Sequence, residues 1–71
     1  MNQENRADRR DALLRQMGLS VNVVDQILTL LEGMQGEVNA LRQMIGDNEV
    51  LQRLERQNAL LIAAFTFLRN A

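Results

Sequence analysis

The feature that most constrains this chain is a run of apolar residues with heptad spacing between positions 24 and 45. The gaps between its members alternate between three and four residues. This spacing is typical of a helix that buries one stripe of side chains against another helix. The sequence therefore predicts a long helix over residues 21–45. Its seam residues are Val24, Ile27, Leu31, Met34, Val38, Leu41 and Ile45.

The apolar surface of this helix is wider than that of a two-stranded coiled coil. The positions that flank the seam usually carry charges in such coils. Here four of them are apolar, namely Val23, Leu28, Leu30 and Met44. A wide stripe is typical of a helix in a bundle. We therefore expect the helix to bury more than one face.

A second long helix is expected over residues 48–69, because the residues 46–48 interrupt the first seam. Gly46 can end one helix and Asp47 can cap the next. The two segments 24–45 and 48–69 have equal lengths, so folding back places the apolar run 59–68 beside the widest apolar part of the first helix. This match favours an antiparallel hairpin over one continuous helix with a register shift. The new seam consists of Leu51, Leu54, Asn58, Leu61, Phe65 and Leu68.

A short helix over residues 6–17, ended by Gly18, is expected to precede the hairpin. The predicted fold is thus all-α, with a short N-terminal helix and an antiparallel helical hairpin over helices 6–17, 21–45 and 48–69. The 71 residues make one small domain, residues 1–71. A core of this size rarely contributes more than about 3–5 kcal/mol to the stability of the fold. Such chains therefore usually need a disulfide, a bound metal or a partner chain for additional stability.

The expected source of this additional stability is a second copy of the chain, because the sequence contains no cysteine for a disulfide. Residues 59–68 are apolar around nearly the whole helix, and one facing helix covers only part of that surface. We therefore expect a homodimer that forms a helical bundle. The residues assigned to this oligomer interface are Val24, Ile27, Leu31, Met34, Val38, Leu41, Leu61, Phe65 and Leu68.

One local pattern resembles a helix-turn-helix over residues 13–27. It has an apolar residue, a turn glycine, a serine cap and two core positions: Leu13, Gly18, Leu19, Ser20, Val24 and Ile27. The resemblance implies a small DNA-binding transcriptional regulator. Phosphate contacts would then come from the N-terminal helix, because the helix after Ser20 has no cation before Arg42. With a net charge of −1, nucleic acid is not the expected partner.

Catalysis and cofactor binding are not expected, because the chain has neither histidine nor cysteine. A serine triad lacks its base, and the usual zinc and haem ligands are missing. The polar start lacks the apolar core of a signal peptide. The run 59–68 has about half of the roughly 20 residues that a membrane span needs. We expect a cytoplasmic protein without a membrane segment, a metal or a cofactor.

The expected function is a non-catalytic interaction module: an adaptor, a stoichiometric inhibitor or an assembly factor. A structural coiled-coil component of a larger assembly is the other alternative, and it requires the continuous helix. Aromatic and methionine side chains serve as interface anchors, and arginines can steer an acidic partner. The residues assigned to partner binding are Arg6, Arg9, Arg10, Met17 and Phe67.

Overall fold

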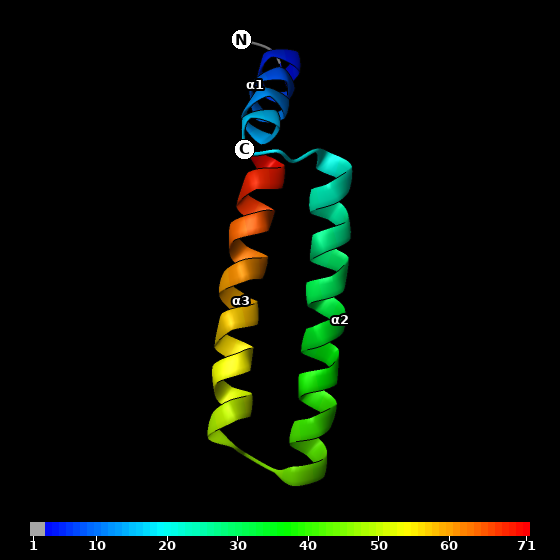
Figure 1. Cartoon of the computed structure of the whole chain (residues 1–71), viewed down its shortest axis with the longest axis vertical. Coiled ribbons are helices and arrows are strands. Elements are labelled where there is room, and N and C mark those ends of the chain that lie inside the picture. Colours follow the sequence, from blue (N-terminus) through cyan, green and yellow to red (C-terminus); the bar gives the residue numbers. More distant parts are fainter. Residues whose placement is uncertain (1–2) are drawn as a thin grey trace.

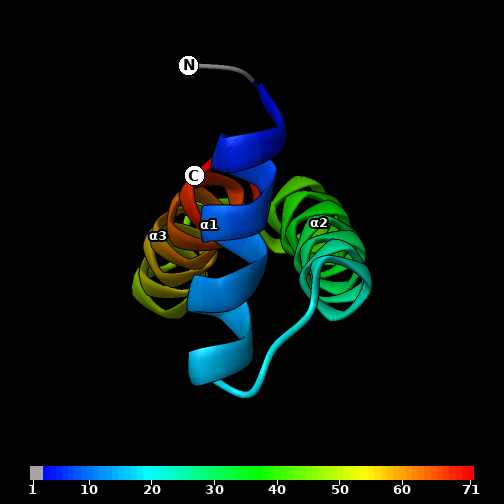
Figure 2. The same ribbon diagram turned by 90° about the horizontal axis from the view of Figure 1, so that it is seen from above.

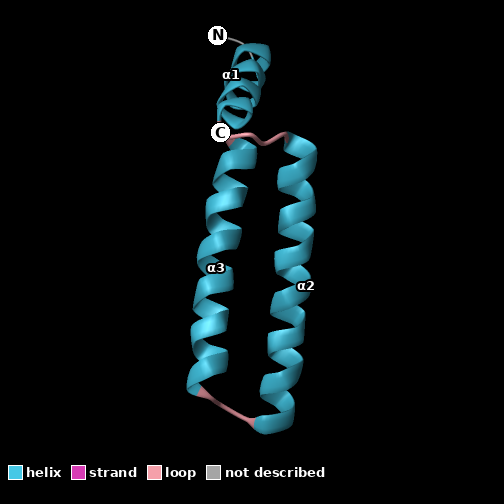
Figure 3. Cartoon of the chain, viewed as in Figure 1, coloured by secondary structure: helices cyan, strands magenta, loops and turns pink. Residues whose placement is uncertain are grey.

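Three helices make up the part of the chain described by the computed structural model, residues 3–71, with side chains described from residue 6 onward. They are α1 (Gln3–Gln16), α2 (Val21–Ile45) and α3 (Glu49–Asn70). Helices α2 and α3 lie side by side and run in opposite directions (Figure 1). Two short loops join the helices (Figure 3). The described residues are therefore all helix and loop, with the chain folded back between α2 and α3 rather than continuing as one helix.

Helix α1 lies across the end of the hairpin where α3 ends, as the view from above shows (Figure 2). The turn after it depends on Gly18, whose φ is +76°. The N–H groups of Gly18 and Leu19 donate to the carbonyls of Arg15 and Leu14 at 3.0 and 2.7 Å. These bonds satisfy the last carbonyls of α1 in the manner of a Schellman motif. Because a left-handed residue follows the helix, the chain can turn sharply toward α2.

The two helices of the hairpin begin at capping side chains. Ser20 Oγ accepts a hydrogen bond from the Val23 N–H at 3.2 Å. At the other end Gly46 has a φ of +79°, and its N–H donates to the Arg42 carbonyl at 2.7 Å. The cap of α3 is Asn48, whose Oδ1 accepts from the Val50 N–H at 2.8 Å. The expected cap was Asp47, and this was wrong: Asn48 has the extended backbone of an N-cap, with φ −149° and ψ 139°, and its side chain makes the capping bond.

The most tightly packed core lies where α1 meets the hairpin. Leu14, Val24 and Leu28 are buried there, and Leu19, Val21, Ile62, Phe65 and Leu68 pack against them. Leu14 is the residue through which α1 contributes to this core. In addition, Arg10 Nη1 donates to the Arg69 carbonyl at 3.3 Å, which ties α1 to the last turn of α3. The N-terminal helix therefore covers one end of the hairpin.

Half of the predicted seam lies between α2 and α3, and the other half does not. The buried members are Val24, Leu31, Val38, Leu51 and Asn58. The positions between them are taken by residues one place further along α2 or α3, including Leu28, Gln35, Arg42, Glu55 and Ile62. Two helices can bury only one flank of a wide stripe against each other. The flank that they bury here includes polar residues that bond across the hairpin.

Candidate interaction surface

An apolar stripe runs along one side of the hairpin, on the flank that the two helices do not bury against each other. Its members repeat every seven residues and are Ile27, Met34 and Leu41 on α2, with Leu54, Leu61 and Leu68 on α3. Because equivalent heptad positions of antiparallel neighbours lie on the same side, the two rows share one face. We call these six residues the apolar stripe.

Two ion pairs across the hairpin show which residues of α2 and α3 lie opposite each other. Asp25 pairs with Arg69 at the α1 end, and Arg42 pairs with Glu55 near the loop. Counting along the helices from these pairs places Met34 level with Leu61 and Leu41 level with Leu54. The four central side chains, Met34, Leu41, Leu54 and Leu61, are 48, 43, 37 and 45% exposed. These side chains gather partly exposed apolar surface on one face of the hairpin.

The residues assigned to the oligomer interface fall into two groups. Val24, Leu31 and Val38 are buried within the chain, so their side chains already have partners between α2 and α3. Phe65 is half-buried against the same core. The other five belong to the apolar stripe: Ile27, Met34, Leu41, Leu61 and Leu68, of which Ile27 and Leu68 are half-buried and Leu68 also packs against the core at the α1 end. Leu54 completes the stripe and was missing from the assigned interface, although its heptad position predicted it.

A polar layer closes the opposite flank of the hairpin near the loop. Glu55 Oε2 accepts hydrogen bonds from Arg42 Nη1 at 2.7 Å and from Gln35 Nε2 at 3.4 Å. The hydrogen bond from Arg42 lowers the pKa of the Glu55 carboxyl from its ordinary value. The same bond raises the pKa of the Arg42 guanidinium. This layer was not predicted from the sequence, because its partners lie on different helices and become neighbours only after the chain folds back.

Acid is expected to weaken the fold through Glu55. Because its pKa is lower in the folded chain, the unfolded chain binds more protons, and stability falls as pH falls through that pKa. The contribution is fully present above the unfolded value of about 4.3. Thermal melts should therefore show Glu55→Gln a few degrees less stable than wild type at neutral pH, with the gap closing in acid. Glu32→Gln, on the exposed surface of α2, is the control. A Glu55→Gln gap that stays constant down to acid pH would contradict this.

The residues assigned to partner binding lie in different surroundings. Arg10 is used within the chain, since it also pairs with Asp11 at 3.1 Å. Arg6 and Arg10 line a hollow of about 320 Å³ together with the last residues of α3. Arg9 is exposed on α1. Met17 and Phe67 are exposed large apolar side chains, at the end of α1 and on α3. The assignment of these residues to a partner stays a prediction.

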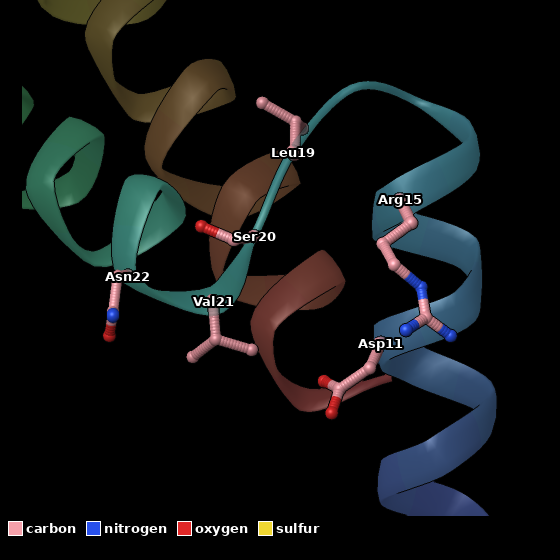
Figure 4. A pocket seen from close by; sticks show the side chains of 6 residues that line it. All are labelled: Asp11, Arg15, Leu19, Ser20, Val21 and Asn22. Atoms are coloured by element: carbon pink, nitrogen blue, oxygen red, sulfur yellow. The ribbon is translucent and has the colours of Figure 1, made fainter.

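The segment that resembles a helix-turn-helix encloses a second hollow, of about 280 Å³. Figure 4 shows Asp11 and Arg15 of α1 on one side of it and the residues 19–22 on the other. The first turns of α2 expose Asn22, Val23, Asp25 and Gln26, none of which is a cation. The rest of α2 packs along α3. DNA binding by this segment stays a prediction.

The fold and the surface define a small three-helix chain with an apolar stripe along its hairpin. Among residues 6–71, whose side chains the structure describes, no group of acidic side chains is placed to hold a metal ion. In the same part of the chain, none of the helices combines the length and the apolar character needed to span a membrane. Comparisons with protein-family models, with curated proteins and with solved structures found no match. The function must therefore be inferred from the surface itself.

Proposed function

We propose that this chain is a non-catalytic protein–protein interaction module that works as a homo-oligomer, most simply a homodimer. The observation that carries the proposal is the apolar stripe, which runs the length of the hairpin and contains no charged residue. Exposed apolar surface is costly in water, and a second stripe of the same shape removes it. The interface is then isologous, with the same residues on both copies.

The exposed area of the chain supports a second copy as the first occupant of the stripe. A compact monomer of 8.1 kDa exposes about 4,500 Å². This chain exposes 5494 Å². The excess is about 1,000 Å², and each partner in an interface of standard size buries about 800 Å². Pairing of two hairpins through the stripe would therefore bring the exposed area of each chain close to that of a compact protein.

A foreign partner would use surfaces that the stripe-to-stripe pairing leaves open. Phe67 lies one residue before the stripe member Leu68 and is strongly exposed, and Met17 is exposed in the turn directly after α1. These two side chains are the apolar anchors that we propose for an adaptor, inhibitor or assembly role. The structural coiled-coil alternative required one continuous helix, and the chain instead folds back at Gly46.

Self-association is tested by sedimentation equilibrium of the wild-type chain over a concentration series. We expect a dimer that dissociates only in the low micromolar range or below, because the stripe offers an interface of standard size. Circular dichroism at the same concentrations reports whether the helices persist on dilution. A folded monomer at every concentration would overturn the proposal.

A further inference from the structure

Each helix of the hairpin has two flanks beside its buried row, and only one of them faces the other helix. On α2 the buried row is Val24, Leu31 and Val38, and on α3 it includes Leu51 and Asn58. The flank that faces inward consists of Leu28, Gln35 and Arg42 on α2 and of Glu55 and Ile62 on α3. We call these residues the inner flank. The other flank is the apolar stripe, so the chain buries the more polar of its two flanks.

Burying the inner flank leaves polar atoms without hydrogen bonds inside the hairpin. They are Gln35 Oε1, Arg42 Nε and, in the buried row, Asn58 Nδ2. A buried polar atom without a hydrogen bond is unfavourable, because it has lost its contact with water and gained no partner. At the same time, the four central side chains of the apolar stripe remain 37–48% exposed. Apolar burial alone therefore does not explain why the inner flank is the one that is buried.

A second packing of the same helices would have the opposite properties. If each helix turned about its own axis by about 50°, half of the angle between successive residues, the apolar stripe would enter the interface. Gln35 and Arg42 would then return to water, while the buried row would stay central. This packing corresponds to the heptad seam of the sequence, in which Asn58 is the polar member. It would leave no apolar stripe for a partner to bind.

Contacts at the two ends of the inner flank favour the packing that the structure has. Leu28 packs with Leu14 of α1 at one end. Near the loop, Glu55 Oε2 accepts hydrogen bonds from Arg42 Nη1 at 2.7 Å and from Gln35 Nε2 at 3.4 Å. The Arg42 and Glu55 side chains are 30 and 38% exposed, so water screens their attraction less than it would at an open surface. Turning the helices would move both groups into water and weaken these bonds.

We propose that Glu55 is a positioning residue for the interaction surface: its bonds to Arg42 and Gln35 hold α2 and α3 in the packing that keeps the apolar stripe on the outside. Without these bonds the helices turn, and the stripe closes within the chain. This inference rests on the proposed function of the stripe and names the residue that keeps the stripe accessible. A residue on the flank opposite the stripe then controls whether the stripe can bind a second copy.

The turn is measured with a single thiol on each flank, because the chain has no cysteine of its own. Leu61→Cys places the thiol on the stripe, and Ile62→Cys places it on the inner flank of the same helix. In Glu55→Arg, two cations would meet at the inner flank. We therefore expect alkylation at position 62 to become several-fold faster and alkylation at position 61 to become several-fold slower. The rates are measured at a chain concentration where sedimentation shows a monomer, so that a second copy does not shield position 61.

Rescue and control variants separate this effect from a general loss of stability. Arg42→Glu combined with Glu55→Arg restores an opposite pair with reversed charges and should restore both rates. Glu32→Arg makes the same change of charge at an exposed position of α2 and should leave both rates unchanged. Unchanged rates in Glu55→Arg, or faster alkylation at both positions with the helical signal retained, would overturn the inference. If Glu55→Arg loses its helical signal in circular dichroism, Glu55→Gln takes its place. That variant must speed alkylation at position 62 and slow it at position 61, or the inference is wrong.

Self-association is the second readout, and a purely local role of Glu55 would not change it. We expect Glu55→Arg to lose the dimer at concentrations where the wild type sediments as one, and the charge-reversed pair to regain it. A Glu55→Arg chain that dimerises like the wild type would overturn the inference and leave self-association standing. A wild type that is monomeric at every concentration would overturn the proposed function, and the alkylation rates would then decide on Glu55 alone.

Discussion

Leu61→Asp is expected to weaken self-association by about 10,000-fold or more while the hairpin stays folded. Leu61 is 45% exposed in the single chain and lies at the middle of the apolar stripe. In the proposed dimer both copies would bury an unpaired carboxylate at this place, and each such charge costs about 3–5 kcal/mol. Every 1.4 kcal/mol corresponds to about tenfold in the dissociation constant. Sedimentation equilibrium of the variant and the wild type measures the change.

Leu60→Asp is the matched control for this prediction. Leu60 is the neighbouring residue, is 72% exposed, and lies on the side of α3 away from both α2 and the stripe. The two variants carry the same new charge on the same helix. We expect Leu60→Asp to dimerise like the wild type. Equal weakening in both variants would show that charge on α3 matters rather than the stripe, and an unchanged dimer in Leu61→Asp would exclude the stripe as the interface.

The helices and their order could be predicted because the signals for them are local. The seam period over residues 24–45 identifies α2, and Gly18 and Gly46 identify the two places where a left-handed residue lets the chain turn. The bounds of α2 agree with those expected, and the other two helices differ from expectation by no more than three residues. Equal helix lengths and matching apolar ends were sufficient to predict the hairpin.

The pairing inside the hairpin could not be predicted in the same way. Heptad spacing identifies a wide stripe but does not say which flank of it packs within the chain. The apolar Met34 and Leu41 were expected in the seam, but Gln35 and Arg42, one residue later, face α3 instead. There both side chains bond to Glu55. This complementarity joins residues far apart in sequence, so it becomes visible only when the register of α2 and α3 is known.

The apolar stripe was predicted only in part, because the sequence does not show which of its neighbours are buried within the hairpin. Five members of the apolar stripe were assigned to an oligomer interface from their spacing alone. Burial of Leu31 and Val38 within the chain depends on the hairpin, and Val24 also packs with Leu14 of α1. The unpaired amide of Asn58 is a property of its surroundings, and no pattern in the sequence shows it.

Leu28→Ala is expected to destabilise the fold by about 2–5 kcal/mol, the range for removing a buried leucine side chain. Leu28 is 2% exposed and packs with Leu14 and Val24, so the cavity left by the substitution is enclosed by all three helices. A domain of this size loses about 4–8 °C of melting temperature per kcal/mol. The melting temperature should therefore fall by about 10 °C or more, measured by circular dichroism at fixed protein concentration.

Leu60→Ala removes the same atoms from an exposed position and isolates the effect of burial. Because Leu60 faces solvent, its loss should change the melting temperature by no more than a few degrees. Both melts are run at the same chain concentration, since dissociation of a dimer adds to the measured stability. If Leu28→Ala melted within a few degrees of Leu60→Ala, the core at the α1 end could not be what holds the three helices together. The stability would then have to come from the stripe, and in that case Leu61→Asp should lose its helical signal together with its dimer.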